Sequence, residues 1–158
     1  MRKVIFLLFI TFSLSSTVWA ADPIIGTWKR NLEKSTLYQS RRDLIKDIIE
    51  VYKETEGNMI ETTYTSFRKD GSTLVIKRIF PKEGGIVKYV DSEIQEGILN
   101  IVIPVGSGDW FISTIVNGRN VLLRHMMVSK DGKTLIETFK GTNMEGKPVD
   151  AMAVSDRQ

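Results

Sequence analysis

Apolar and polar residues alternate along much of the chain from Met59 onward. The stretch Met59–Phe67 is rich in β-branched and aromatic residues, and Leu74, Ile76 and Phe80 share one face of the next segment. A period of two is typical of β-strands, because successive side chains point to opposite faces of a sheet. Several later segments are apolar on both faces, so the pattern alone does not say which face is inward. The predicted strands are Met59–Phe67, Leu74–Phe80, Ile86–Val90, Ile98–Ile103, Trp110–Val116, Val121–Val128, Leu135–Lys140 and Val149–Val154.

Glycine-containing turn sequences separate these segments. Their glycines lie 9 to 14 residues apart, which leaves about seven to ten residues, a strand length, for each segment between them. Asn-Gly and Asp-Gly are strong hairpin signals because glycine adopts positive φ at little steric cost. Short turns between sequence-adjacent strands predict an antiparallel meander. The glycines are Gly57, Gly71, Gly84, Gly97, Gly106, Gly118, Gly132 and Gly146.

The segment before Gly57 fits two kinds of secondary structure. Its second half alternates as a strand would, yet apolar side chains also recur at helical spacing, at Leu44, Ile45, Ile48, Ile49 and Tyr52. We predict a short helical turn over Arg41–Lys46 and a strand from about Ile48 to Thr55.

About nine or ten antiparallel strands in one domain would leave exposed sheet edges unless the sheet closes. Closure into an up-and-down barrel of about 8–10 strands removes the edges, and barrels of that size can enclose one ligand. We therefore predict an all-β barrel, with a two-sheet β-sandwich as the alternative. Pro104 cannot donate to a ladder, so it ends the Ile98 strand or marks an edge or a bulge there.

Residues 1–20 differ from the rest of the chain. Arg2 and Lys3 precede an apolar run that begins at Val4, and Ala20 offers a small residue for cleavage. This order is typical of a secretory signal peptide, and the apolar run is short for a membrane-spanning helix. A retained N-terminal anchor is the alternative. We expect cleavage after Ala20, a single domain over residues 21–158, and a periplasmic or extracellular location.

Composition excludes several kinds of site. The 158 residues include no cysteine and one histidine, which rules out disulfides, thiolate zinc sites, iron–sulfur ligation and multi-histidine metal sites. The net charge of +3 falls to +1 without Arg2 and Lys3, so no basic stripe argues for nucleic acid.

Charged residues within the predicted strands argue against insertion of the mature chain into a membrane as a barrel. These residues are Lys53, Lys77, Lys88, Glu137 and Lys140.

No residue stands out as catalytic. His125 is predicted to face away from its neighbour Arg124 on an alternating strand, and a surface or hydrogen-bonded role is favoured over a haem ligand. Ser107 and Ser113 lack a nucleophile-elbow sequence. We predict no catalytic residue, no metal site and no cofactor, and a non-enzymatic function is therefore favoured. A solvated strand face is favoured over an acid pair for Glu50, Glu54, Glu56 and Glu61.

Two ends of the chain carry a resemblance. The Gly-x-Trp sequence Gly26-Thr27-Trp28 opens the first predicted strand, and turn sequences at 129–135, 141–143 and 146–149 follow near the C-terminus. Together they resemble small exported bacterial lipocalin-like proteins, which have calycin-type barrels. Over residues 37–110, the similarity is limited to the spacing of the predicted strands and turns. The resemblance implies an eight- to ten-stranded barrel without an assigned activity. It also implies that Gly26 and Trp28 close one end, with Arg124 or Arg157 stacked on the Trp28 ring.

We expect an exported, soluble barrel that carries a small hydrophobic or amphipathic molecule by burying its apolar surface. The alternative is a filled barrel that acts as a non-enzymatic protein-interaction or structural module. Strand aromatics and methionines are the candidate lining residues, and core packing is the alternative role for each. They are Tyr64, Phe80, Trp110, Phe111, Met127 and Phe139.

Overall fold

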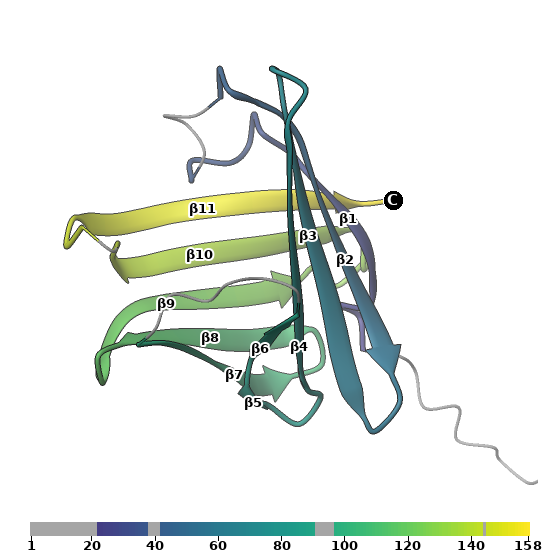
Figure 1. Ribbon diagram of the computed structural model, residues 1–158. Coiled ribbons are helices and arrows are strands. Elements are labelled where there is room, and N and C mark those ends of the chain that lie inside the picture. The colour runs from purple at the N-terminus through teal and green to yellow at the C-terminus, as the bar shows by residue number, and fades with distance from the viewer. Residues whose placement is uncertain (1–21, 38–41, 91–96, 144) are drawn as a thin grey trace, which may run out of the picture.

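The computed structural model describes residues 22–37, 42–90, 97–143 and 145–158, and every regular element within them is a β-strand (Figure 1). The predicted signal peptide lies outside the described residues. No helix in the described part of the chain is long and apolar enough to cross a membrane. The strands are β1 (Gly26–Arg30), β2 (Ile45–Thr55), β3 (Met59–Arg68), β4 (Thr73–Pro81), β5 (Gly85–Ile86), β6 (Lys88–Val90), β7 (Ile98–Gly106), β8 (Asp109–Val116), β9 (Arg119–Val128), β10 (Thr134–Thr142) and β11 (Pro148–Arg157).

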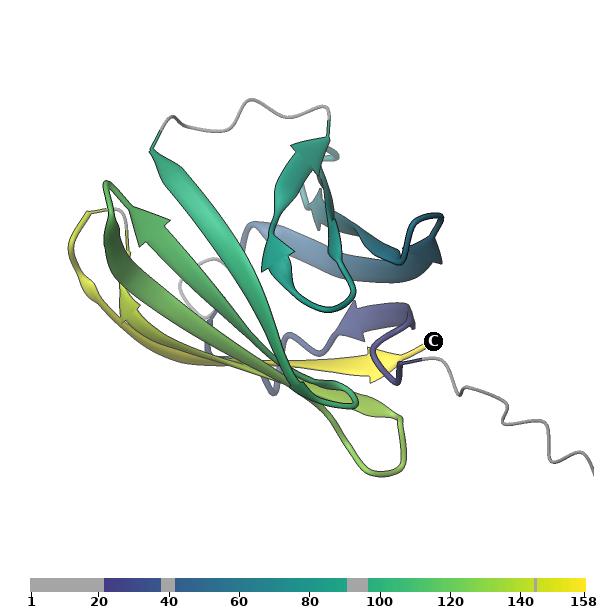
Figure 2. The same cartoon turned by 90° about the horizontal axis from the view of Figure 1, so that it is seen from below.

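All 11 strands belong to one antiparallel sheet, in the order β5-β7-β8-β9-β10-β11-β1-β2-β3-β4-β6. Because β1 pairs with both β2 and β11, the two ends of the described chain lie side by side. The sheet curls into two facing walls, β7–β11 and β2–β4 (Figure 2). β5 pairs with β7 while β6 pairs with β4, so the short segment 85–90 bridges the remaining gap. The predicted all-β barrel is confirmed.

One predicted boundary is wrong, and a β-bulge explains why. β2 begins at Ile45, so Ile45 and Lys46 are strand residues, and residues 42–44 form a turn rather than a helix. The pairing register of β2 with β3 shifts between Ile45 and Asp47. A bulge moves the inward-facing parity by one residue, so Ile45 and Ile48 are both buried although they lie three apart. This spacing imitates a helical face.

Pro104 also lies at an irregularity. It remains within β7, opposite Trp110, and the register with β8 shifts between Pro104 and Gly106. Of the alternatives left by the sequence, the bulge is therefore the one observed.

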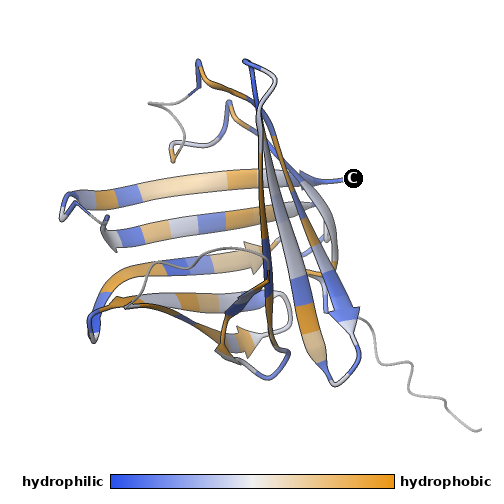
Figure 3. Ribbon diagram, viewed as in Figure 1, coloured by the Kyte–Doolittle hydropathy of each residue, from blue (hydrophilic) through white to orange (hydrophobic). Residues whose placement is uncertain are grey.

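Apolar and polar residues are interspersed along the strands of the sheet (Figure 3), as expected for a sheet with one inner and one outer face.

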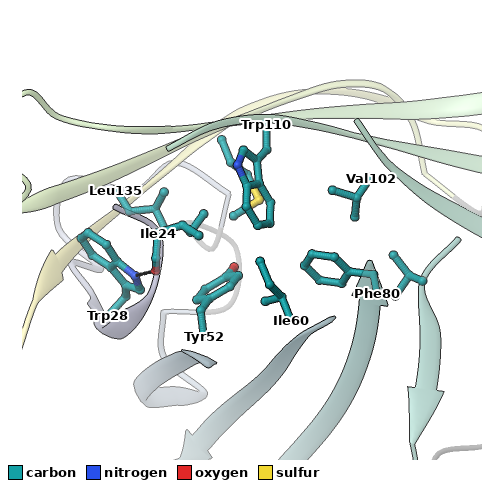
Figure 4. Close-up of a cluster of buried hydrophobic side chains, with 10 residues drawn as sticks. Ile24, Trp28, Tyr52, Ile60, Phe80, Val102, Trp110 and Leu135 are labelled. Carbon is teal, nitrogen blue, oxygen red and sulfur yellow. Dashed lines mark hydrogen bonds between the residues drawn. The ribbon is translucent and has the colours of Figure 1, made fainter. Parts of the chain in front are cut away.

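A buried tryptophan packs against an arginine where β1 and β11 pair. Trp28 is fully buried, and its Nε1 donates a 2.8 Å hydrogen bond to the carbonyl oxygen of Ile24 (Figure 4). The Arg157 guanidinium lies 4.2 Å from the Trp28 ring centroid and donates to the backbone oxygens of Pro23, Ile25 and Gly132. Such a stack contributes about 1 kcal/mol, more where water is excluded.

The glycine of the Gly-x-Trp sequence makes room for this stack. Gly26 has a φ of +143°, and a Cβ atom there would lie 2.5 Å from Nη1 of Arg157. A larger residue at this position would therefore displace the guanidinium from the Trp28 ring. Arg157 and Trp28 are direct partners across β11 and β1, so the strand register itself selects Arg157 over Arg124.

Candidate ligand-binding cavity

The barrel interior contains a cavity of about 170 Å³. Its wall draws on every strand from β2 to β4 and from β6 to β10. Trp110 and Phe80 meet edge to face, with ring centroids 5.6 Å apart, and both project into the interior (Figure 4). The apolar lining residues are Phe80, Val87, Trp110, Ile112, Leu122, Met126 and Phe139. The polar lining residues are Tyr52, Thr62, Arg78, Tyr89, Asn100, Thr114 and Arg124.

Three of the six predicted lining residues line this cavity, namely Phe80, Trp110 and Phe139. Strand alternation corrects two others. Trp110 and Met126 face inward, so their neighbours Phe111 and Met127 face outward. Phe111 stacks on the His125 ring with centroids 4.3 Å apart, and Met127 is exposed.

The sixth predicted lining residue, Tyr64, lies elsewhere in the barrel. It lines an adjoining hollow of about 150 Å³, together with Leu37 and Ile76. The hollow and the cavity share Arg78, Arg124 and Phe139 as lining residues. Two arginines and one phenylalanine therefore lie between the cavity and the hollow at Tyr64.

The charged side chains form a buried cluster. Arg30 Nη2 lies 2.5 Å from Glu50 Oε1 and 3.4 Å from Glu137 Oε2. Arg124 Nη2 lies 2.9 Å from Glu137 Oε1 and 3.5 Å from Glu50 Oε2. The Tyr52 hydroxyl donates a 2.8 Å hydrogen bond to Glu50 Oε2. Two carboxylates are thus held between two arginines inside the barrel.

The cluster shifts the pKa values of Glu50, Arg124 and Tyr52. Burial alone would raise the pKa of Glu50, but the surrounding guanidinium groups lower it from 4.5 to about 2. Burial opposes the charge of Arg124 as well, yet the neighbouring acidic groups, Glu137 first among them, together outweigh it and raise the pKa of Arg124. Burial, followed by the Glu50 charge, raises the pKa of Tyr52 well above its ordinary value, so its hydroxyl remains a donor.

Arg78 is a third arginine beside the cluster. Its positive charge contributes to the lowered pKa of Glu50, and its side chain lines both the cavity and the adjoining hollow. Three arginines therefore face two glutamates, Glu50 and Glu137, which leaves an excess of one positive charge.

Several donors that line the cavity have no acceptor. Among the described residues, Thr62 Oγ1, Arg78 Nε, Trp110 Nε1 and Arg124 Nε are buried without a hydrogen-bond partner, and all four residues line the cavity. A buried donor without a partner costs about 1–3 kcal/mol, and such groups are rare in folded proteins.

Other polar groups of the wall satisfy one another. Asn100 Nδ2 donates to the Tyr89 hydroxyl and Thr114 Oγ1 donates to Asn100 Oδ1, each at 2.7 Å. The unpartnered donors therefore differ from these polar groups of the wall, and a bound molecule could supply their acceptors.

Sequence reasoning missed the charged cluster. Glu50 was expected on a solvated face, but it is only 4% exposed. A signal was present, because each charged residue lies two positions from a buried apolar residue and so shares its face. These pairs are Arg30 with Trp28, Glu50 with Ile48, Arg78 with Phe80, Arg124 with Met126, and Glu137 with Leu135.

His125 lies outside the barrel. Its Nε2 is 2.6 Å from Asp109 Oδ1, and both side chains are about one-third exposed. The structure thus places Arg124 and His125 on opposite faces of β9. In the described ranges, no group of three or more histidine, aspartate or glutamate side chains is arranged to hold a metal ion.

Acid is expected to weaken the fold through Glu50. The pKa of this carboxyl group is about 2 in the folded protein against an ordinary 4.5, so the unfolded chain takes up the proton first as the pH falls. The stabilisation is complete above about pH 4.5, is lost progressively towards pH 2, and amounts to about 3 kcal/mol. Urea unfolding of the wild type and Glu50→Gln across this range measures it. The assignment would be contradicted if the free energy of unfolding of the wild type fell no more steeply with decreasing pH than that of Glu50→Gln.

The structure is an antiparallel β-barrel with an interior cavity. No protein-family model matches the chain, and no curated protein matches it. Among solved structures, the chain is similar to the crystal structure of the fluorescent protein UnaG, wild type. The TM-score is 0.55 at 15% sequence identity, over 85% of this chain and 96% of UnaG. At this identity the similarity establishes the fold alone.

Proposed function

We propose that the protein is exported and binds a small hydrophobic or amphipathic molecule inside the barrel. One observation carries this proposal: a cavity of about 170 Å³ lies in the barrel interior and is lined by buried donors that lack acceptors. Ligand sites combine an apolar wall with a few polar groups that fix orientation, and this cavity has both.

The binding energy would come from apolar burial in a cavity that already exists. Each Å² of apolar ligand surface removed from water contributes about 25 cal/mol before ordering costs. The ladder hydrogen bonds of the sheet hold the cavity wall in place, so little ordering of the protein is needed when a ligand enters.

The first 20 residues support the export part of the proposal. Their basic start, apolar run and terminal Ala20 have the order of a secretory signal. Processing at this point would leave the whole described barrel intact.

Binding of indole, a neutral ring compound, tests the proposed function. Titration calorimetry is expected to show saturable binding of one indole per chain, with a negative heat-capacity change from apolar burial. Leu122 lines the cavity, whereas its neighbour Leu123 is exposed on the outer face. Leu122→Trp should therefore abolish binding, and Leu123→Trp should leave it unchanged.

Circular dichroism of the two variants provides the control, since overpacking an interior costs about 1–3 kcal/mol without changing the fold. Two results would contradict the proposed cavity site. One is the absence of saturable indole binding to the wild type. The other is equal binding to the folded Leu122→Trp variant.

A further inference from the structure

The size of the cavity limits the ligand to a compact molecule. An apolar cavity of about 150 Å³ in another protein takes up one benzene molecule, and the cavity described above measures about 170 Å³. A single ring with a short polar substituent fits this space. A longer apolar chain that extended into the adjoining hollow would pass Arg78, Arg124 and Phe139 and would lie beside Glu50 and Glu137, which would bury apolar atoms against charged groups.

The charges beside the cavity favour an anion. Arg30 and Arg124 contact both glutamates of the cluster, whereas Arg78 forms the positive excess. Arg78 is half-buried and its Nε is buried without a partner, and a charge partly withdrawn from water is costly unless it is paired. One negative charge on the ligand would balance the five side chains.

The unpartnered donors specify the kind of anion. Arg78 Nε, Arg124 Nε and Thr62 Oγ1 are buried, lack acceptors and belong to residues that line the same cavity. A carboxylate has two oxygens with about four acceptor sites, and its hydrogen bonds to guanidinium groups are about twice as strong as neutral ones. The apolar wall at Phe80 and Met126 is left for the body of the ligand.

We infer that the ligand is a compact monoanion, a single-ring molecule with one carboxylate that accepts hydrogen bonds from Arg78, Arg124 and Thr62. This inference rests on the proposed function, because it specifies what the same cavity takes. It distinguishes the ligand from neutral ring compounds by charge, and from long-chain carboxylates by size.

Three probes separate charge from size in calorimetric titrations of the purified full chain. Phenylacetate carries a ring and a carboxylate, 2-phenylethanol is its neutral counterpart, and decanoate carries the same charge on a longer chain. Phenylacetate is expected to bind about 10- to 100-fold more tightly than 2-phenylethanol, the range for hydrogen bonds to charged groups. Decanoate is expected to bind more weakly than phenylacetate.

Two variants test the donors. Arg78→Met keeps the aliphatic stem and removes the charge, so it should equalise the affinities for phenylacetate and 2-phenylethanol. Thr62→Val removes one hydroxyl without changing the side-chain shape, and it should weaken phenylacetate more than 2-phenylethanol. Arg68→Met, at the exposed end of β3, is the matched control and should leave all three affinities unchanged.

The outcomes distinguish this inference from the proposed function. The inference is overturned if 2-phenylethanol binds as tightly as phenylacetate, if decanoate binds more tightly, or if neither Arg78→Met nor Thr62→Val changes the preference. In each of those cases the proposed function stands as long as indole still binds to the wild type. If indole and all three probes fail to bind, the proposed function itself is contradicted.

Discussion

Replacing Glu137 with glutamine is expected to lower the free energy of unfolding by about 3–5 kcal/mol, the usual cost of breaking a buried ion pair. Glu137 is fully buried between Arg30 and Arg124. Without its charge, three arginines would face Glu50 alone. Since whole domains are stable by only about 5–15 kcal/mol, this variant should unfold at a much lower urea concentration.

The same substitution at the surface provides the control. Glu145 pairs with Lys147 at 2.8 Å, but both side chains are more than two-thirds exposed. Exposed ion pairs contribute about 0–1 kcal/mol, so Glu145→Gln should unfold almost as the wild type does. Similar urea midpoints for Glu137→Gln and Glu145→Gln would show that the buried cluster does not stabilise the barrel.

Replacing Trp28 with alanine is expected to cost about 3–5 kcal/mol, as for other large aromatic residues in protein cores. The change would open a cavity in the core and remove the ring beneath Arg157. It would also leave the carbonyl oxygen of Ile24 without its donor. Urea unfolding followed by far-ultraviolet circular dichroism measures the loss.

Trp28→Phe separates the contributions of the ring and the hydrogen bond. It keeps an aromatic face under Arg157 but lacks the Nε1 donor, so its loss should be less than half that of Trp28→Ala. If Trp28→Ala lowered the free energy of unfolding by no more than about 1 kcal/mol, the surrounding side chains would have to fill the space of the missing ring. That result would contradict the expectation for a closely packed core.

The meander was predictable because its signals are local. Turns such as Asn117-Gly118 and Asp131-Gly132 require glycine at positive φ, and this requirement can be recognised without knowing what the turn packs against. The bulge between Ile45 and Asp47 was not predictable in this way. It is a feature of the pairing of β2 with β3, and the sequence of one strand imitates a helical face there.

The candidate site was predicted only in its aromatic part. Assigning charged residues to solvent hid the cluster of Glu50 and Glu137, whose burial depends on partners that lie far away in the chain. The stack on Trp28 could not be assigned for a similar reason. The choice between Arg124 and Arg157 depends on the register of β11 with β1, a pairing that joins the two ends of the described chain.

Native mass spectrometry of the protein purified from an exporting host, before and after organic extraction, tests most directly whether the barrel carries a small molecule. If the barrel carries a small molecule, the protein shows a reproducible mass above that of the polypeptide. Extraction removes this extra mass, and it returns when the extract is added back. A bare polypeptide mass, together with no uptake of indole or phenylacetate, would contradict this proposal and would favour a filled barrel that binds another protein.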